Sequence, residues 1–321
     1  MKTIVYLAAA LAPTLPAAAL SQQYPTKAVR IVVGFAPGGG TDIVARIIGA
    51  KLTELWGQSF IVDNRAGAAG TIGADITAKS PPDGYNIMLG HVNSHAISPN
   101  LYKKLPYDSM RDFAMVAYVG YVPNVLVIHP SIPAKNVGEL AAIAKAKPKT
   151  LTYASSGVGS TQHLAGELFQ LTTRTQLVHV PYKGSGPAVV DLMAGHVVMN
   201  FDTMPPVLPY VRQGKLRALA VTTPKRAAQL ADTPTMLEAG LNGFEMTNWY
   251  GFMAPAKTPH EIVAKLNGEI NRIMAMPEQK TKLEEVGTQL SPMSAEQFAR
   301  FLEAELAKYA KLIRAAGVTL D

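Results

Sequence analysis

Short apolar runs alternate with amphipathic stretches along the chain from residue 29 onward. Val29–Gly34 is an apolar run of strand length, and Thr41–Trp56 carries apolar residues at helical spacing. The same alternation continues through a strand at Phe60–Asp63, a small-residue helix at Gly70–Lys79 and a strand at Asn86–Gly90. This order predicts an α/β architecture with mostly parallel strands.

A second unit with the same alternation begins near Asn124. Its predicted strands are Val125–Ile128, Leu151–Ala154, Val178–Val180, Val197–Phe201 and Leu216–Val221, and its predicted helices are Val137–Ala146, Ala188–Ala194 and one carrying Leu164, Leu168 and Leu171. The apolar run Trp249–Pro255 is a further strand. Amphipathic helices follow it, one starting at Pro259 and one after the capping box Ser294–Gln297.

Two glycine-rich turns connect a predicted strand to a predicted helix, at Gly38–Thr41 and at Ser156–Thr161. The first turn of a helix has free backbone N–H groups and the positive end of the helix dipole, so both turns suit an anion. Ligands of open α/β sheets bind outside the carboxyl ends of the strands, where both turns lie. If the turns belong to two lobes, they face one cleft.

The N-terminus has the pattern of a secretory signal peptide over residues 1–21. Lys2 precedes a short apolar core, which ends in prolines and in the small residues Ala17–Ala19. The core is about half the ~20 residues that a membrane span needs. We expect cleavage near Ala19–Ser21 and export to the periplasm.

Composition restricts the chemistry further. The chain has 321 residues and no cysteine, which excludes disulfides, zinc–thiolate sites and cysteine nucleophiles. Its net charge of +7 comes from scattered Lys and Arg, and this favours acidic ligands without indicating nucleic acid.

Motifs for nucleotide and hydrolytic chemistry are incomplete. Gly34 and Gly39 have P-loop spacing, but Gly40 stands where the phosphate-binding lysine is required. Gln162 replaces the third glycine of a dinucleotide fingerprint, and no Gly-x-Ser-x-Gly elbow occurs. His91 and His95 are four residues apart without the glutamate of a zinc protease, so no metal is expected.

Several residues have both a structural and a functional interpretation. Asp202 follows an apolar strand and is either a turn cap or a carboxylate at the cleft edge. His163 is either a cap or a ligand contact. The aromatic residues Phe35, Trp249 and Tyr250 belong to the core or form an apolar wall of the cleft.

A set of ordered motifs resembles one family. The matching segments are Tyr24-Pro25, Val33–Asp42, Asp63–Gly70, Pro82–Tyr85, Pro99–Tyr102, Val180–Gly184 and Ala194-Gly195. Together they make residues 24 to 321 similar to a Bug-type (TctC-like) periplasmic solute-binding receptor of a tripartite tricarboxylate transporter. Where that family usually has Thr-His-Ala, this chain has Asn93-Ser94-His95-Ala96.

The resemblance implies a two-lobe, type II-like periplasmic-binding fold with two crossover strands as its hinge. One lobe would comprise residues 22–123 and 249–321, and the other residues 124–248. A carboxylate would be held through backbone amides and two bridging waters. The residues implied in the site are Phe35, Ala36, Gly39, Gly40, Thr41, Asp42, Ser156, Gly157, Ser160, Thr161 and Asp202, with Asn93 and His95 as weaker candidates.

The predicted function is therefore capture of a small carboxylate between two lobes and its delivery to a membrane permease. The ligand would be a dicarboxylate, a tricarboxylate or an aromatic acid. We expect a monomer with no cofactor, no nucleic-acid partner and no enzymatic activity. The alternative is a periplasmic α/β hydrolase of a small carboxylate ester.

Overall fold

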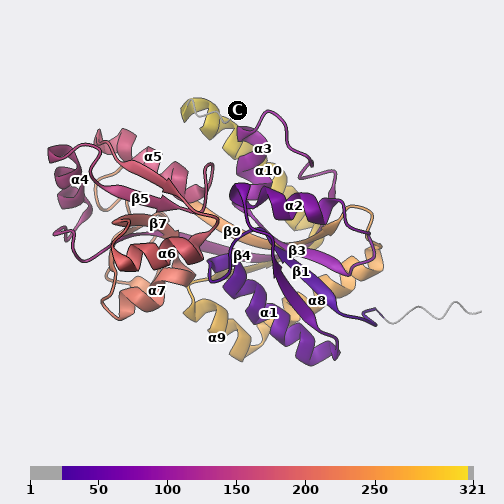
Figure 1. The fold of residues 1–321 in the computed structure, drawn as a ribbon. Helices are drawn as coiled ribbons and strands as arrows, with labels where there is room; N and C mark the ends of the chain where they lie inside the picture. The colour runs from indigo at the N-terminus through magenta and orange to yellow at the C-terminus, as the bar shows by residue number, and fades with distance from the viewer. Residues whose placement is uncertain (1–23, 317–321) are drawn as a thin grey trace, which may run out of the picture.

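The computed structural model describes residues 24–316. The predicted signal peptide and its cleavage site lie outside the described residues. The described chain forms two lobes joined by two long strands, which cross between them (Figure 1).

The first lobe is built on parallel strands flanked by helices. Strand β1 (Val29–Val33) pairs in parallel with β2 (Phe60–Asn64) on one side and with β3 (Asn86–His91) on the other. The connecting helices are α1 (Gly40–Trp56) and α2 (Thr71–Ala78). A π-helical turn over residues 93–97 follows β3 and leads into α3 (Ser98–Leu101). The C-terminal part of the chain adds three further helices to this lobe: α8 (His260–Ala275), α9 (Pro277–Glu285) and α10 (Ala295–Ala316).

The second lobe repeats the plan with a smaller sheet. Its strands are β5 (Thr152–Ser155), β6 (Val178–Pro181), β7 (Met199–Thr203) and β8 (Arg217–Val221), and its helices are α4 (Val137–Ala146), α5 (Thr161–Thr173), α6 (Ser185–Ala194) and α7 (Met204–Arg212). Strand β5 pairs in parallel with both β6 and β7.

The crossover strands are β4 (Phe113–Ile128) and β9 (Thr247–Pro255). The strand order is β2-β1-β3-β9-β4-β7-β5-β6, with β8 and β10 (Gln289–Met293) also paired to β4. Every pairing of β4 and β9 is antiparallel, so the expectation of mostly parallel strands is wrong for the centre of the sheet.

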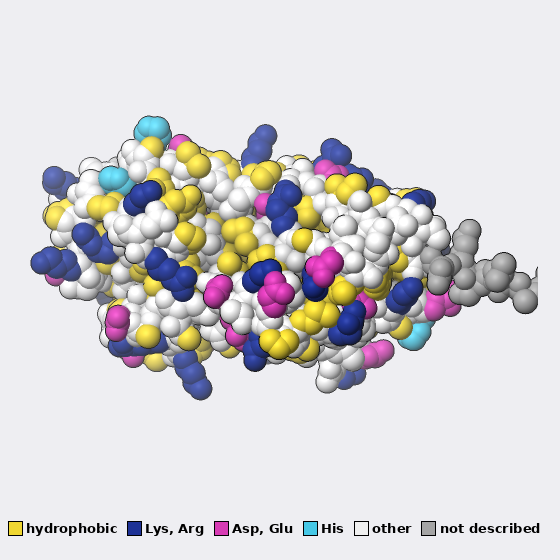
Figure 2. All heavy atoms as spheres, turned by 90° about the horizontal axis from the view of Figure 1, so that it is seen from below, with side chains coloured by type: hydrophobic (Ala, Val, Ile, Leu, Met, Phe, Trp, Pro, Cys, Tyr) yellow, Lys and Arg dark blue, Asp and Glu magenta, His cyan; other side chains and the backbone are white. Residues whose placement is uncertain are grey.

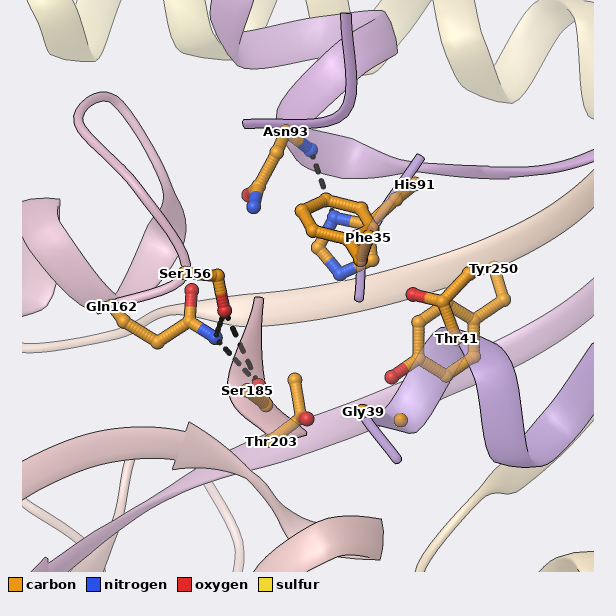
Figure 3. A pocket seen from close by; sticks show the side chains of 11 residues that line it. Phe35, Gly39, Thr41, His91, Asn93, Ser156, Gln162, Ser185, Thr203 and Tyr250 are labelled. Atoms are coloured by element: carbon orange, nitrogen blue, oxygen red, sulfur yellow. Dashed lines mark hydrogen bonds between the residues drawn. The ribbon is translucent and has the colours of Figure 1, made fainter. Parts of the chain in front are cut away.

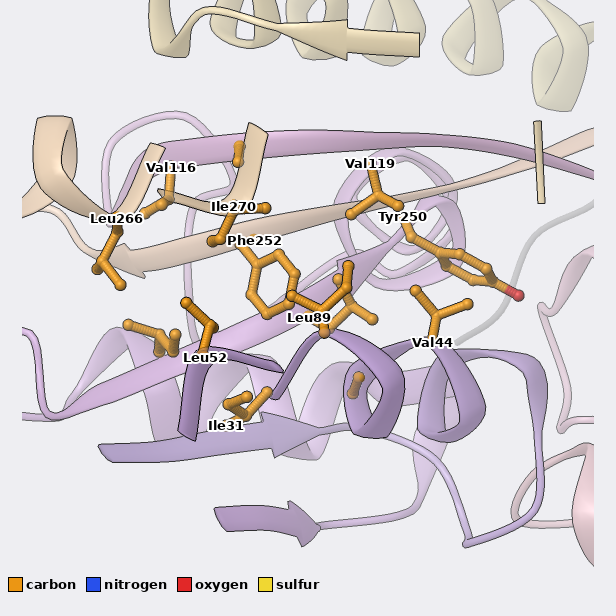
Figure 4. Packing of buried hydrophobic residues seen from close by; sticks show 14 of the residues in the cluster. Ile31, Val44, Leu52, Leu89, Val116, Val119, Tyr250, Phe252, Leu266 and Ile270 are labelled. Carbon is orange, nitrogen blue, oxygen red and sulfur yellow. The ribbon is translucent and has the colours of Figure 1, made fainter. Parts of the chain in front are cut away.

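Each lobe has its own hydrophobic core. In the first lobe, α1 and α8 cover one face of the sheet, where Leu52, Phe252 and Ile270 pack together (Figure 4). Helix α10 covers the other face with Phe298, Leu302 and other buried residues at helical spacing. The lobes are therefore separately packed bodies, and this allows them to move relative to one another.

Several elements were not predicted from the sequence. The strand predicted at Val125–Ile128 is the end of a strand that begins at Phe113. Helix α7 contains three prolines, which hid its helical pattern. Helix α9 and strand β10 are short and mainly polar or exposed.

Basic residues do not form a continuous stripe on the face shown in Figure 2, where they are interspersed with acidic and apolar side chains. Within residues 24–316, no helix is long and apolar enough to cross a membrane. The same part of the chain contains no group of three or more His, Asp or Glu side chains placed to hold a metal.

Candidate ligand-binding site

The first glycine turn brings the start of α1 against the second lobe and β9. Gly39 caps α1 in an extended conformation without a side-chain hydrogen bond, so the first N–H groups of the helix stay free. A Cβ on Gly40 would lie 2.3 Å from the Tyr250 hydroxyl and 2.9 Å from Thr203 Oγ1. Only glycine allows the backbone to come this close.

Asp42 holds the shape of this turn. Its carboxylate accepts hydrogen bonds from the N–H of Gly38 at 3.0 Å, from Arg46 Nε at 3.0 and 3.1 Å, and from Asn64 Nδ2 at 3.0 Å. Burial raises the pKa of Asp42, but the hydrogen bonds from Arg46, Gly38 and Asn64 outweigh it and bring the pKa below its ordinary value. The ionised Asp42 side chain thus stabilises the conformation of the first glycine turn.

The second glycine turn connects β5 to α5. Ser160 caps α5, because its hydroxyl accepts the N–H of His163 at 3.3 Å. Gly157 has φ +124°, a conformation that favours glycine. The turn presents the Ser156 hydroxyl, which accepts from Gln162 Nε2 at 2.7 Å and lies 3.2 Å from Ser185 Oγ.

Asp202 lies fully buried near the end of β7, behind the side chains that face the cleft. It accepts hydrogen bonds from Ser185 Oγ at 2.5 Å, the N–H of Thr203 at 2.8 Å and Asn200 Nδ2 at 2.8 Å. Burial raises the pKa of Asp202 to about 6, against the lowering effect of these donors. At neutral pH the carboxylate is ionised and fixes the proton of Ser185.

These elements enclose one small cavity between the lobes. The space measures about 10 Å³, room for about one water molecule. Residues from both lobes line it, namely Phe35, Gly39, Gly40, Thr41, His91, Asn93, Ser156, Gln162, Ser185, Thr203 and Tyr250 (Figure 3). None of these lining residues is a lysine or an arginine.

Two buried polar groups at this cavity lack a hydrogen-bond partner among the described residues. They are the Tyr250 hydroxyl and Asn93 Nδ2. Thr41 and Thr203 lie beside the Tyr250 hydroxyl, but neither forms a hydrogen bond of good geometry with it. Buried polar groups are almost always satisfied, so both groups point to a ligand that accepts hydrogen bonds.

His91 is a third donor at the cavity. Its Nδ1 accepts the N–H of Asn93 at 3.0 Å, which leaves the ring proton on Nε2. Burial and the neighbouring His95 lower the pKa of His91 to about 3, so the ring is neutral. It stacks edge-on against Phe35, with 5.2 Å between the ring centroids.

The lobes touch directly around the cavity. Asn93 Oδ1 accepts the N–H of Thr161 at 3.0 Å, and the Thr161 hydroxyl donates to Asn248 Oδ1 at 2.7 Å. Asn248 in β9 in turn donates to Asn124 in β4. The N–H of Ala36 donates to the carbonyl of Lys183 at 3.0 Å. The structure is therefore a closed form.

The structure brings six of the thirteen predicted residues to the cavity wall: Phe35, Gly39, Gly40, Thr41, Asn93 and Ser156. The others have different positions. Asp42, Ser160 and Asp202 support the two turns from behind, and Ala36 and Thr161 form contacts between lobes. Gly157 lies in the bend of the second turn.

His95 faces away from the cavity. Its ring packs 4.8 Å from Phe113, and its Nδ1 lies 2.9 Å from Ser94 Oγ. The polar loop expected here is a π-helical turn, which rotates His95 into the first lobe while His91 remains at the end of β3.

Five lining residues lie outside the set of thirteen: His91, Gln162, Ser185, Thr203 and Tyr250, of which the sequence offers Tyr250 only as a core residue or an apolar wall of the cleft. Gln162 directly follows the predicted residue Thr161, and Thr203 directly follows the predicted residue Asp202. Ser185 follows a glycine and opens a helix, which makes it a third strand–turn–helix position of the kind sought. His91 ends β3 and Tyr250 lies in β9, and the order of the strands in the sheet places both beside the cavity.

Comparison with known proteins agrees with this geometry. Residues 44–318 match the family described as "Tripartite tricarboxylate transporter family receptor". The chain is 38% identical over 301 residues to protein BugT of Bordetella pertussis, covering 92% of this chain and 91% of BugT.

Solved structures of similar proteins have the same fold. A protein of R. palustris with adipate is 40% identical, with a TM-score of 0.89 over 92% of this chain and 99% of that one. MatC from Rhodopseudomonas palustris with bound malate is 32% identical, with a TM-score of 0.85 over 90% and 100% of the two chains.

These relatives are binding proteins, and the hydrolase interpretation finds no support among them. The two-lobe fold, the closed cleft with its convergent hydrogen-bond donors and the match over most of the chain lead to one assignment. The chain belongs to the receptor family of the tripartite tricarboxylate transporters, whose members are periplasmic solute-binding proteins.

Proposed function

We propose that this receptor captures a small carboxylate between its lobes and delivers it to the membrane permease of a tripartite transporter. The observation that carries the proposal is the set of convergent donors around one enclosed point, without any cation among the lining residues. Helix α1, of 17 residues, begins there, and its free first N–H groups favour negative charge.

The donors suit a carboxylate better than a phosphate ester. The Tyr250 hydroxyl, Asn93 Nδ2 and His91 Nε2 are neutral donors, each able to satisfy one carboxylate lone pair. A doubly charged phosphate would leave more charge uncompensated, because no lysine or arginine lines the cavity. The group held at this point is therefore one carboxylate, and we propose that the ligand carrying it is a dicarboxylate, a tricarboxylate or an aromatic acid.

Asp202 acts through Ser185. Because the ionised Asp202 accepts the only hydroxyl proton of Ser185, the Ser185 oxygen can only accept from its other neighbours, Ser156 Oγ at 3.2 Å and Gln162 Nε2 at 3.4 Å. Asp202 thus fixes the direction of the hydrogen bonds that run through Ser185 to Ser156 and Gln162 at the cavity wall, where the bridging waters that the family resemblance implies would bind, without touching the ligand.

Binding requires the lobes to open. A space of about 10 Å³ cannot admit a dicarboxylate. The hinge would lie in β4 and β9, near Asn124 and Asn248, between a lobe of residues 22–123 and 249–321 and a lobe of residues 124–248. Ligand contacts to both lobes would then stabilise a closed form with a wider cleft than the one described here, relative to the open form.

The same proposal assigns the remaining properties. The receptor works as a monomer in the periplasm, after cleavage of its signal peptide near Ala19–Ser21, and its partners are the permease subunits. The adipate and malate bound by its two relatives indicate that aliphatic dicarboxylates are the first ligands to test.

A thermal-shift screen tests the proposal. Adipate, malate, citrate and benzoate are added to the purified mature protein, and native mass spectrometry identifies any ligand retained from expression. At least one carboxylate should raise the melting temperature. The proposal fails if no carboxylate does so and the same protein hydrolyses carboxylate esters.

A further inference from the structure

A second cavity lies on the opposite face of the crossover strands. Trp249 and Tyr250 are consecutive in β9, so their side chains point to opposite faces of the sheet. Tyr250 reaches the cleft between the glycine turns, whereas Trp249 lines a separate cavity of about 500 Å³. This volume is in the range of small-molecule sites.

Aromatic side chains form the floor and one wall of this second cavity, which we call the hinge-side cavity. Trp249 and Tyr118 are almost fully buried beneath it. The ring of Phe301, from α10, packs edge-on against both, with centroid distances of 5.7 Å to Trp249 and 4.8 Å to Tyr118. Tyr121 is fixed by a hydrogen bond to Gln289 Oε1 at 2.8 Å. The wall is therefore a rigid surface suited to a flat ring.

The charged groups at the cavity have an excess of cations. Lys225, Arg226 and Lys308 line it together with a single carboxylate, Glu305. Glu305 is already engaged by Lys308 at 3.2 Å and by Trp249 Nε1 at 3.0 Å. Arg226 pairs with Glu238 at 2.9 Å outside the cavity. In the described chain, Lys225 makes no ion pair.

We propose that the hinge-side cavity is a second binding site, selective for a small aromatic carboxylate. The ring would lie against Phe301 and Tyr121, and the carboxylate would pair with Lys225. The excess of cations opposes a cationic ligand, which an aromatic box alone would otherwise favour. Neither the two glycine turns nor the donors of the main cleft take part in this site.

Fluorescence of Trp249 gives a direct test. The chain has two tryptophans, and a Trp56→Phe background leaves Trp249 as the only indole. Benzoate is titrated into this variant. We expect a saturable change in Trp249 emission, and about tenfold weaker apparent binding for benzyl alcohol, which has the same ring without the charge.

Lys225→Glu in the same background should weaken the benzoate response about tenfold. Lys215→Glu is the matched control, since Lys215 is an exposed lysine of the same lobe outside the cavity, and it should leave the response within about twofold of the background. Both substitutions are on the surface and should not prevent folding.

The proposal is overturned if benzoate gives no saturable change up to about 10 mM. It is also overturned if Lys225→Glu and Lys215→Glu have equal effects, because benzoate then binds elsewhere. Neither result would affect carboxylate binding in the main cleft, which calorimetry measures separately with the cleft ligand found in the thermal-shift screen.

Discussion

Asn93 and Thr161 join the two lobes across the ligand cleft. Asn93 Oδ1 accepts the backbone N–H of Thr161, the first residue of α5, at 3.0 Å. The same amide leaves its Nδ2 buried beside the cavity without a partner. Asn93 therefore has two roles: its Oδ1 stabilises the contact between the lobes, and its Nδ2 is a donor available to the ligand.

Replacing Asn93 with alanine should weaken carboxylate binding about tenfold, through loss of one net hydrogen bond to the closed state and one to the ligand. Isothermal titration calorimetry measures the change. Asn242→Ala, at an exposed loop asparagine, is the control and should bind like the parent. Equal affinity of all three proteins would remove Asn93 from both roles.

Gly186 should be essential for full closure. A Cβ at this position in the second lobe would lie 1.9 Å from the carbonyl oxygen of Pro37 in the first. Gly186→Val should hold the lobes apart, so that carboxylate affinity falls at least about tenfold while each lobe stays folded.

The control for Gly186→Val is Gly268→Val, at a helical glycine that has open space around it. Small-angle scattering with saturating carboxylate should show a larger radius of gyration for Gly186→Val than for Gly268→Val. Two identical compact profiles would mean that closure does not bring Gly186 against Pro37.

Tyr250→Phe should separate binding from stability. The Tyr250 hydroxyl is buried without a hydrogen bond in the described structure, so removing it should leave the free energy of unfolding unchanged or raise it. Affinity for the carboxylate should nevertheless fall, because the ligand loses a donor.

Tyr24→Phe provides the opposite case. The Tyr24 hydroxyl donates to the carbonyl of Gly84 at 2.7 Å, far from the cleft, so its loss should cost about 1 kcal/mol of stability and leave affinity unchanged. Urea unfolding and calorimetry on both variants check the contrast. A Tyr250→Phe protein that loses stability but keeps its affinity would contradict the assignment.

Asp202 should make stability depend on pH. Burial raises its pKa from an ordinary value of 3.8 to about 6, so between these values the folded state binds more protons than the unfolded state. The free energy of unfolding should therefore fall as pH rises from about 4 to about 6, and this contribution should be constant above.

Asp202→Asn lacks this titration. Urea unfolding of both proteins at several pH values should show the stability of the parent, relative to the variant, falling across that window. The variant should fold and bind carboxylate more weakly, because an uncharged amide oxygen accepts the Ser185 proton more weakly than the carboxylate does. A stability difference that does not vary with pH would argue against a raised pKa of Asp202.

The two glycine turns could be recognised from the sequence because their signals are local. An apolar strand, glycines and a helical pattern occur together at residues 31–52 and again at 151–171. Backbone N–H groups at a helix start need no particular side chain, so the pattern alone predicts an anion site at Gly38–Thr41, and the family resemblance adds the individual residues.

The remaining wall of the cleft depends on strand order and register. Tyr250 faces the cleft because β9 lies between β3 and β4 with Tyr250 on the front face and Trp249 on the back. A one-residue shift would exchange the two side chains. His91 and His95 could not be told apart, since the turn between them is π-helical and no local pattern predicts it.

The most direct test of the central claim compares a carboxylate with its own amide. Calorimetry is performed with adipate and malate, or with the acid found in the screen, and with the corresponding diamide. A cleft that recognises the charge through helix N-termini and neutral donors should bind one acid with a Kd of about 1 μM or tighter and its amide at least about 100-fold more weakly. Equal binding of acid and amide, or binding of neither, would contradict the account.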